Sequence, residues 1–400
     1  MSGGTTHMKP WHIEICDVTL RDGEQTPGVS FTADEKKDIA SRLDAIGIEV
    51  IEAGFPIVSA HEKEMVRNIS RLGLSAKICG LSRACREDVD AALDAEVDMI
   101  GLFIAPSDLH LKYKHKKPRD VVVANALEQL DYAVDHGLIV RFGAEDASRT
   151  DPDILVDIYR QAADHKATYV TYADTTGCLT PLEVATVMKD LVPKTPIPIA
   201  MHAHNDLGCA TANTLIAAEL GAYQLHTTVN GLGERAGNAR LEEVLVSLVL
   251  KGGITRYDLT EIPALSERVQ QYTGIFMPAT KPVVGANAFA HESGIHIAAI
   301  LENPETYEFI PPELLGLERR FILGKHTGKR ALVHILTSFG YHITDEQVMQ
   351  VLELIKDKSE DKCSINQRVL AEIISQVTGE DKINGDIIGE DSRCPGRHVY

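Results

Sequence analysis

The sequence lacks the cysteine spacing of a thiolate metal site. It has seven cysteines in 400 residues, an odd number, and no two of them form a CxxC pair. Four of them, Cys16, Cys79, Cys178 and Cys209, lie inside or beside apolar segments. This pattern favours reduced, mostly buried thiols in a cytoplasmic protein over a disulfide framework or a zinc site.

Long apolar runs and an excess of positive charge are also missing. No apolar run approaches the ~18 residues of a membrane helix, and Met1–Pro10 has no apolar core of the signal-peptide type. The sequence contains 40 Lys and Arg residues and 58 Asp and Glu residues, which gives a formal net charge of -18. This balance disfavours non-specific binding to nucleic acid or to an anionic membrane, although a local basic pocket can still bind an anionic ligand. We therefore expect no nucleic-acid and no membrane partner.

Glycine loops of the phosphate-binding kind are absent as well. The segment Asn230–Asn238 has three residues between its last two glycines, which is the wrong spacing for a dinucleotide loop. A tight turn that delivers Glu234, Arg235 or Asn238 to a site is the better interpretation. Gly324–Lys329 also has three residues between its glycines and is not a Walker motif. It is either a basic loop near an anionic ligand or a solvated loop.

What the chain does have is a regular alternation of short β-rich runs and longer segments of helical periodicity, such as Asp34–Ile46 and Val121–His136. Eight βα units in ~240 residues match the size and order of a TIM barrel better than a doubly wound sheet. The expected strands are Ile13–Thr19, Glu49–Gly54, Ala76–Ser82, Met99–Ala105, Leu138–Glu145, Thr168–Thr175, Ile199–His204 and Tyr223–Asn230.

The alternation stops after residue 252, which indicates further domains. Segments 331–339, 345–359 and 365–377 have helical periodicity, and the last twenty or so residues are rich in charge. We expect an N-terminal extension, a catalytic barrel, a linker subdomain and a small helical domain with a poorly ordered tail. Their expected bounds are 1–12, 13–275, 276–330 and 331–400.

Polar side chains gather where the predicted strands end, which is where barrel enzymes place their reacting groups. His202 and His204 alternate on one strand and so point to one face, as a pair of metal ligands would. Arg141 and Glu145 share a face of another strand, where a structural ion pair is the competing interpretation. The first strand ends in a dense charged run, Asp17–Gln25.

Together these segments resemble the acyl-CoA-condensing metallo-barrel family of isopropylmalate, homocitrate and citramalate synthases. The resemblance spans residues 13 to about 330, and its set of motifs is highly specific. The matching stretches are Asp17–Gly28, Glu52–Pro56, Glu145–Thr150, Ala173–Gly177, His202–Gly208, Asn230–Asn238 and Asn287–His296.

The resemblance implies a divalent cation (Zn, Mn or Mg), acetyl-CoA as co-substrate and a small 2-oxo acid as acceptor. It implies a homodimer whose partner subunit supplies His296 to a proton-transfer site with Glu145, with Tyr307 as a further catalytic residue. The implied metal ligands are Asp22, His202, His204 and Asn238. The implied substrate-binding residues are Arg21, which also stabilises the developing alkoxide, and Gln25, Arg141 and Thr175.

Arg141 bears on the choice of oxo acid, because an arginine here resembles the homocitrate synthases that bind the distal carboxylate of 2-oxoglutarate. The form Thr-Leu-Arg-Asp-Gly-Glu-Gln, with Asp22, looks like the methanogen-type enzymes but also like isopropylmalate synthases. Gly143 stands where serine is common in the family. We expect homocitrate synthase first, isopropylmalate synthase next and citramalate synthase third. A lyase of the hydroxymethylglutaryl-CoA type and an inactive binding barrel are the other classes.

Overall fold

The computed structural model describes residues 11–360 and 364–379. Most of the predicted N-terminal extension and the predicted tail lie outside the described residues. The chain divides into two compact units, which we describe one at a time. Unit 1 comprises Met1–Ala288 with Glu313–Leu317, and unit 2 comprises Phe289–Pro312 with Glu318–Tyr400.

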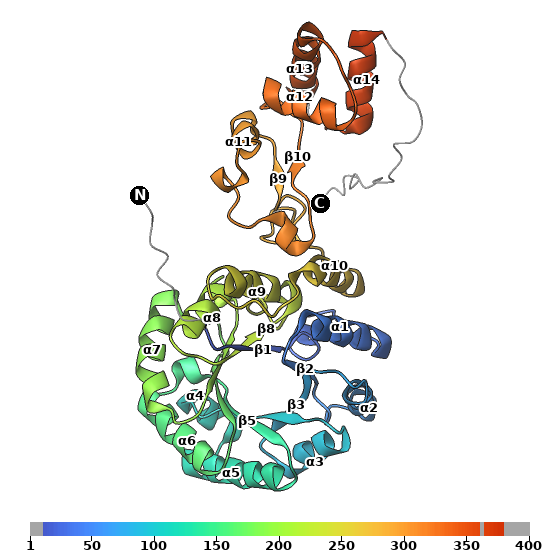
Figure 1. The fold of residues 1–400 in the computed structure, drawn as a ribbon. Helices are drawn as coiled ribbons and strands as arrows, with labels where there is room; N and C mark the ends of the chain where they lie inside the picture. Colours follow the sequence, from blue (N-terminus) through green and yellow to red (C-terminus); the bar gives the residue numbers. More distant parts are fainter. Residues whose placement is uncertain (1–10, 361–363, 380–400) are drawn as a thin grey trace. The chain divides into compact units, whose positions relative to one another are not determined.

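Unit 1 is built on a closed barrel of eight parallel strands in the order β1 to β8 (Figure 1). Each strand pairs in parallel with its neighbours, and β1 closes the ring against β8 with Cys16 opposite His226. The TIM barrel and all eight predicted strands are confirmed. The strands are β1 (Glu14–Asp17), β2 (Val50–Gly54), β3 (Lys77–Arg83), β4 (Met99–Ile104), β5 (Ile139–Ala144), β6 (Tyr169–Asp174), β7 (Ile199–Ala203) and β8 (Gln224–Thr227).

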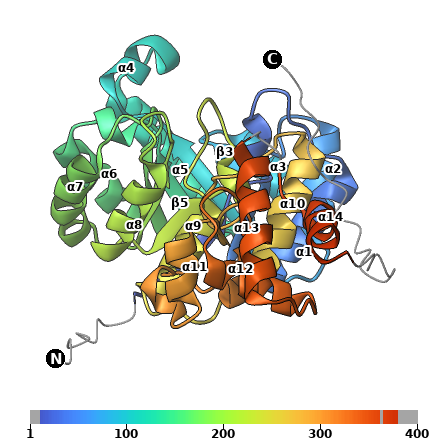
Figure 2. The same ribbon diagram turned by 90° about the horizontal axis from the view of Figure 1, so that it is seen from above.

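Helices surround the barrel of unit 1, as Figure 1 shows along the barrel axis and Figure 2 from the side. Asp151 and Thr180 cap helices that begin with proline, as the sequence predicted. The helices are α1 (Ala33–Ile46), α2 (Ala60–Ser70), α3 (Arg86–Asp94), α4 (Asp108–His110), α5 (Arg119–Asp135), α6 (Pro152–Asp164), α7 (Pro181–Lys194), α8 (Ala210–Glu219), α9 (Leu241–Leu250) and α10 (Ile262–Thr273).

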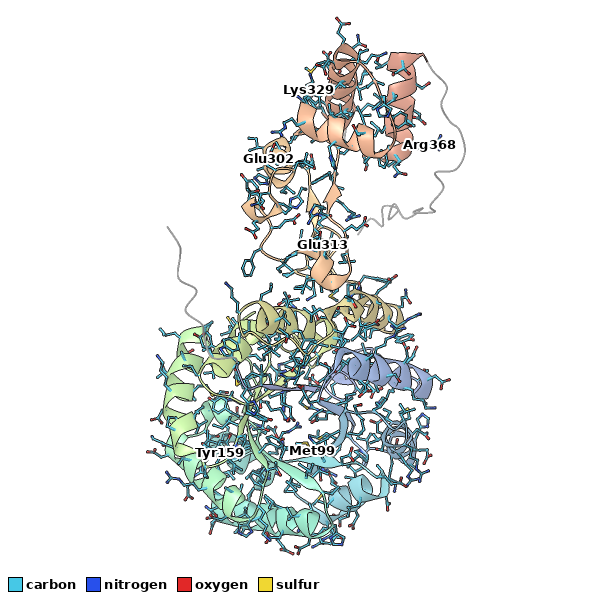
Figure 3. The ribbon with its side chains drawn as sticks, viewed as in Figure 1. Met99, Tyr159, Glu302, Glu313, Lys329 and Arg368 are labelled. Atoms are coloured by element: carbon cyan, nitrogen blue, oxygen red, sulfur yellow. The ribbon has the colours of Figure 1, made fainter. Side chains whose placement is uncertain are left out.

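Side chains fill both the inside of the barrel and the layer between strands and helices (Figure 3). In the outer layer, Tyr159 of α6 is fully buried and its hydroxyl donates to the carbonyl of Thr171 over 2.8 Å. Inside, an apolar cluster combines Cys16, Val18, Val50, Cys79, Met99 and Tyr169. The barrel is therefore a packed core, and space for a ligand exists only where the inner side chains are small or polar.

The described residues of unit 2 form two short parallel strands, β9 (Ala290–His291) and β10 (Arg320–Phe321), and four α-helices. Leu332, Leu336, Val351, Ile355 and Ile373 are among the buried residues of its separate apolar core. The three predicted C-terminal helices are confirmed to within a few residues. The helices are α11 (Gly294–Ile300), α12 (Lys329–Ser338), α13 (Asp345–Glu360) and α14 (Gln367–Thr378).

The expected burial of the thiols needs a correction. Cys16 and Cys79 are buried, but Cys178 is exposed and Cys209 is half-buried. Both exceptions lie in loops after a strand rather than in the apolar runs beside them, Cys178 after β6 and Cys209 at the start of α8. Within residues 11–360 and 364–379, no helix combines the length and the apolar character that crossing a bilayer requires.

Candidate active site and metal centre

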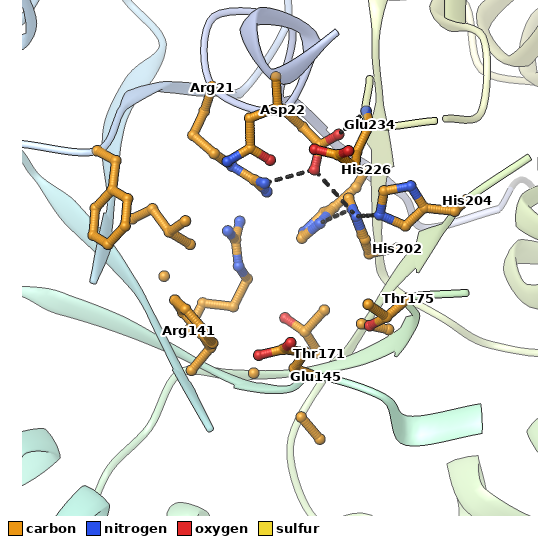
Figure 4. Close-up of a pocket in the computed structure, with 18 of the residues that line it drawn as sticks. Arg21, Asp22, Arg141, Glu145, Thr171, Thr175, His202, His204, His226 and Glu234 are labelled. Carbon is orange, nitrogen blue, oxygen red and sulfur yellow. Dashed lines mark hydrogen bonds and ion pairs between the residues drawn. The ribbon is translucent and has the colours of Figure 1, made fainter. Parts of the chain in front are cut away.

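A cavity of about 300 Å³ opens where the strands of unit 1 end. Figure 4 shows that it is lined by polar side chains from many strands, which point toward one another across the opening. Eight residues that the family resemblance assigned to the site line this cavity. They are Arg21, Asp22, Gln25, Arg141, Glu145, Thr175, His202 and His204.

Asp22, His202 and His204 form a buried group whose ligand atoms all lie within 4.8 Å of one another. The two Nε2 atoms of the histidines are 3.2 Å apart, and the Nε2 of His202 lies 3.7 Å from Oδ2 of Asp22. A carboxylate and two imidazoles that converge in this way are a common set of ligands for a divalent transition metal. The donor set therefore fits the cation that the sequence predicted.

The loop after β8 brings Asn238 to the same place. Its Nδ2 donates to Oδ1 of Asp22 over 2.7 Å, and its buried Oδ1 accepts no hydrogen bond from any described residue. Gly233 has φ +149°, and a Cβ there would lie 2.1 Å from Nδ2 of Asn238. Glycine is thus required by close approach to the carboxamide, and the predicted tight turn is confirmed.

Electrostatics keep this group in the protonation states that bind metal. Burial would raise the pKa of Asp22, but the guanidinium of Arg21 and the hydrogen bond from Asn238 bring that pKa below its usual range. Burial, with His204 as neighbour, lowers the pKa of His202 to about 3, and burial also lowers the pKa of His204. Both imidazoles are therefore neutral near pH 7, as ligation requires.

Arg21 and Arg141 share one buried carboxylate, Glu52 of β2. Nε of Arg21 pairs with Oε1 of Glu52, and Nη2 of Arg141 pairs with Oε2. Burial would raise the pKa of Glu52, but the two arginines lower it, so Glu52 is ionised. Gly101 makes room, because a Cβ there would lie 2.7 Å from Nη2 of Arg141. The trio carries a net charge of one positive unit.

Glu145 directly follows β5 on the other side of the cavity. Its Oε2 lies 2.5 Å from Nζ of Lys114, and its Oε1 lies 3.6 Å from Nε2 of His110. Thr175 lies nearby, where its hydroxyl accepts from the backbone N–H of Asp146 over 2.8 Å. Sequence reasoning did not identify Lys114, which lies in a short π-helix, Leu111–His115.

A buried lysine supports the loop that carries Arg21 and Asp22. Nζ of Lys36 contacts both oxygens of Glu62, at 2.9 and 3.0 Å, and lies 2.7 Å from Oε2 of Glu24. It also donates to the carbonyl of Leu20 over 3.3 Å. The charged run after β1 thus divides: Arg21 and Asp22 line the cavity, whereas Glu24 takes part in this supporting cluster.

The remaining predicted residues, His296 and Tyr307, lie in unit 2. Their rings stack with centroids 4.0 Å apart and an angle of 24° between planes. His296 is exposed, and 48% of the surface of Tyr307 is accessible. The neighbouring apolar side chains are also exposed, with 78% of the surface of Ile295 and 64% of that of Phe309 accessible. The two predicted residues are therefore together, on an accessible surface of unit 2.

Two models of known protein families match this chain. A model described as HMGL-like matches residues 12–269, and one described as homocitrate synthase post-HMGL domain-like matches residues 283–363. The chain belongs to the HMGL-like family. The family resemblance recognised from the sequence motifs is thereby confirmed.

Proteins similar to this chain include synthases and a lyase. A homocitrate synthase, AksA, of Methanosarcina mazei is 52% identical over 379 residues, which cover 94% of each chain. A 2-isopropylmalate synthase of Methanocaldococcus jannaschii is 44% identical over 93% of this chain and 73% of its own. The crystal structure of hydroxymethylglutaryl-CoA lyase from Pseudomonas aeruginosa has a TM-score of 0.61 at 21% identity, covering 73% of this chain and 98% of that one. It shares the fold.

Sequence reasoning missed several polar residues inside this HMGL-like barrel. Glu52 was quoted for its motif but given no role, and His226 and Gln224 were not singled out. Glu52 interrupts the apolar strand Val-Ile-Glu-Ala-Gly, and Gln224 and His226 alternate in the short buried strand Gln-Leu-His-Thr. A carboxylate or imidazole that faces the inside of a barrel needs a partner, so this interruption was the available signal.

Proposed function

We propose that this enzyme condenses acetyl-CoA with 2-oxoglutarate and releases homocitrate and CoA. The observation that carries the proposal is Arg141, a guanidinium in the wall of a cavity that also holds a metal-binding group. The AksA-type homocitrate synthase at 52% identity supports the same choice. A monocarboxylic oxo acid has no second carboxylate to balance the positive charge that Arg21 and Arg141 keep after sharing Glu52.

Charge balance supports a dicarboxylic substrate. Arg21, Glu52 and Arg141 together contribute +1, and a divalent cation with Asp22 would contribute +1 more. Their sum, two positive units, matches the two carboxylates of 2-oxoglutarate. Glu52, Gln224 and Cys16 occupy three of the five N–H donors of Arg141. Among contacts between described residues, Nε–H and one Nη2–H remain for a carboxylate.

We assign the cation to Asp22, His202, His204 and the carboxamide oxygen of Asn238. When bound, the cation supplies Lewis acidity toward a ketone. Arg21 lies beside Asp22, with Nη1 2.6 Å from Oδ2, where it stabilises negative charge that develops on the ketone oxygen. Thr175 and Gln25 line the same cavity and hold the oxo acid. We expect this divalent cation to be Zn, Mn or Mg.

Proton transfer from the acetyl methyl group requires a positioned base. We assign this step to His296 with Glu145, and a further catalytic role to Tyr307, whose ring stacks on His296. Lys114 and His110 hold the carboxylate of Glu145 in place. Water then cleaves the thioester.

We propose a homodimer in which His296 and Tyr307 serve the partner's barrel, and a cytoplasmic location. The exposed apolar side chains Ile295, Tyr307 and Phe309 support an interface. Apolar exposure of this kind is typical of surfaces that bind another chain. The domain bounds 13–275, 276–330 and 331–400 remain our proposal for catalytic, linker and helical parts.

A panel of oxo acids tests the function. Purified enzyme with acetyl-CoA and each of 2-oxoglutarate, 2-oxoisovalerate and pyruvate is assayed for free CoA. We expect 2-oxoglutarate to give the highest kcat/KM. Preference for 2-oxoisovalerate would favour the isopropylmalate synthase alternative, and absence of thiol release with every acid would exclude a synthase.

Arg141→Ala sharpens this test. Losing a hydrogen bond to a charged group costs about 1.5–3 kcal/mol, so kcat/KM for 2-oxoglutarate should fall about 10–150-fold. The value for 2-oxoisovalerate should fall much less. Because the change also removes a partner of buried Glu52, each measurement is paired with a thermal melt. Equal losses for both acids would contradict the assignment of Arg141.

A further inference from the structure

His226 of β8 is a buried histidine that the proposed reaction does not use. Only 3% of its surface is accessible, and it lies at the inner wall of the cavity. Its Nδ1 is 3.3 Å from Nδ1 of His202, and its Nε2 is 3.1 Å from Oε1 of Gln224 (Figure 4 shows His226 beside His202). Both ring nitrogens therefore face a polar atom.

The positions of the hydrogens follow from the metal-binding group. His202 presents Nε2 to His204 and Asp22, at 3.2 and 3.7 Å. A neutral imidazole that offers the Nε2 lone pair carries its hydrogen on Nδ1. That Nδ1–H points at Nδ1 of His226, which must then accept. His226 in turn carries its hydrogen on Nε2 and donates it to Oε1 of Gln224.

The other end of this chain is fixed by a carboxylate. Oε1 of Gln224 also accepts from Nη1 of Arg141 over 3.1 Å, and Nε2 of Gln224 donates to Oε1 of Glu14 over 2.8 Å. Glu14 accepts with its second oxygen from the hydroxyl of Tyr169, over 3.2 Å. The amide of Gln224 can satisfy these partners in one orientation only, because Arg141 has no acceptor and Glu14 no donor when ionised.

We infer that His226 is a positioning residue that holds His202 in the Nδ1–H tautomer and fixes the orientation of its ring. Gln224 anchors His226 and is shared with Arg141, so the ligand His202 and the cation Arg141 are held by one hydrogen-bond chain. The inference rests on the metal site of the proposed function. The chain runs from Glu14 through Gln224 and His226 to His202.

The geometry excludes two other roles for His226. As a metal ligand it would have to join the cluster, but its Nδ1 faces Nδ1 of His202, on the opposite side of that ring from Nε2. As a base toward substrate it would need a free nitrogen, and both nitrogens are engaged. Partners of this kind orient metal ligands, and their loss typically costs 10–100-fold in metal affinity.

The first test reads the tautomers directly. The full-length protein is labelled with 15N-histidine, loaded with Zn²⁺, and studied by long-range 1H–15N NMR. We expect His202 to carry its hydrogen on Nδ1 and His226 on Nε2, with ring signals assigned by comparison with single-histidine variants. A hydrogen on Nδ1 of His226 would overturn the inference, and this readout is taken on the wild-type protein, with the variants used only for assignment.

The second test compares two substitutions of similar size, His226→Asn and His226→Leu. Asparagine places an acceptor oxygen near the position of Nδ1, and leucine places none. We expect His226→Leu to bind Zn²⁺ about 10–100-fold more weakly in chelator competition and to change the Co²⁺ absorption spectrum. We expect His226→Asn to lose less than about tenfold. Equal losses in both variants, or unchanged affinity in His226→Leu, would overturn the inference.

The outcomes separate this inference from the proposed function. Failure of the wild-type protein to bind Zn²⁺ or Co²⁺ would sink the metal site and the proposed function with it. Metal binding with the opposite tautomers would sink only the role of His226. Neither readout depends on which oxo acid the enzyme uses.

Discussion

The groups at the barrel mouth and the stacked pair of unit 2 differ in what holds them. Glu52 is fully buried and ties Arg21 to Arg141, and the metal-binding group is buried beside them. His296 and Tyr307 contact each other, but both are exposed on a surface with other accessible apolar side chains. The residues at the barrel mouth are held in place by buried partners in unit 1, whereas His296 and Tyr307 have mainly each other as a neighbour.

This difference separates two kinds of catalytic positioning. Inside the barrel, each ionised group has an opposite charge or a hydrogen-bond partner, so its geometry is set before any ligand arrives. An exposed histidine gains a defined position only when another surface covers it. We therefore expect changes in the barrel to act on metal binding and stability, and changes in unit 2 to act on turnover alone.

The largest expected effect is that of His204→Ala, which removes one of three converging ligands. Metal content by elemental analysis should fall together with CoA release, which we expect to drop about 10²–10³-fold or more. His165→Ala is the control, since His165 pairs with Asp131 at the surface of unit 1, away from the cavity. Activity that persists in metal-free His204→Ala would break the assignment of the site.

A second prediction concerns the support of the barrel mouth. Lys36→Met leaves Glu62 buried without its cation, a change that typically costs about 3–5 kcal/mol of unfolding free energy. Lys37→Met is a matched control, because Lys37 is partly exposed and its pair with Asp34 at 3.6 Å is worth little. Urea unfolding of the two variants measures the difference. Similar midpoints would show that the buried cluster does not support the loop.

A third prediction uses pH. Burial raises the pKa of Asp17 to about 7 in the folded protein. The folded state then binds a proton that the unfolded state releases, so this group lowers stability as the pH rises from about 4 to about 7. Asp17→Asn should remove that loss, worth up to about 4 kcal/mol at 1.36 kcal/mol per pKa unit.

Thermal melts at pH 4.5 and 7.5 check the third prediction. The variant should melt near the wild type at the lower pH and above it at the higher pH. An equal difference at both values would mean that Asp17 is not protonated in the folded protein. Asn keeps the oxygen that accepts from the backbone N–H of Thr19, so the local turn is retained.

The sequence predicted the barrel well because its signals are local. Runs such as Met99–Ile104 and Ile139–Ala144 alternate with capped helices, and this alternation can be read from the sequence alone. Once the strands are parallel in a barrel, their carboxyl ends lie on the same side and form the site. The pairing of His202 with His204 follows from the two-residue period of one strand. These features need no knowledge of which strands face each other across the barrel.

The partners of those residues could not be predicted in the same way. Arg141 was expected to bind substrate, with a structural ion pair as the competing interpretation, but its partners were not identified. It pairs with Glu52, 89 positions away, and with Gln224, 83 positions away. Both contacts cross the inside of the barrel, where strand tilt and stagger decide which side chains lie level. The periodicity of a single strand does not predict the tilt and stagger of the strands, and so it does not predict these contacts.

The smallest expected effect tests the other side of the comparison, the role of His296. If His296 serves the partner's barrel, a mixed dimer of His204→Ala and His296→Ala subunits has one doubly altered site and one intact site. Random assembly gives half mixed dimers, so the co-expressed pair should recover about a quarter of wild-type activity in a twofold-symmetric assembly. Each variant alone should stay inactive.

A second pair separates shared sites from mere stabilisation. His204→Ala mixed with Asp22→Asn carries both changes in the barrel, so every site keeps one defect, and no activity should return. Purifying mixed dimers through two different affinity tags removes the homodimers and should double the specific activity of the first pair. If the first pair stays inactive in purified mixed dimers, His296 does not act on the partner's cavity. The exposed surface of unit 2 would then need an occupant other than a second copy of the barrel.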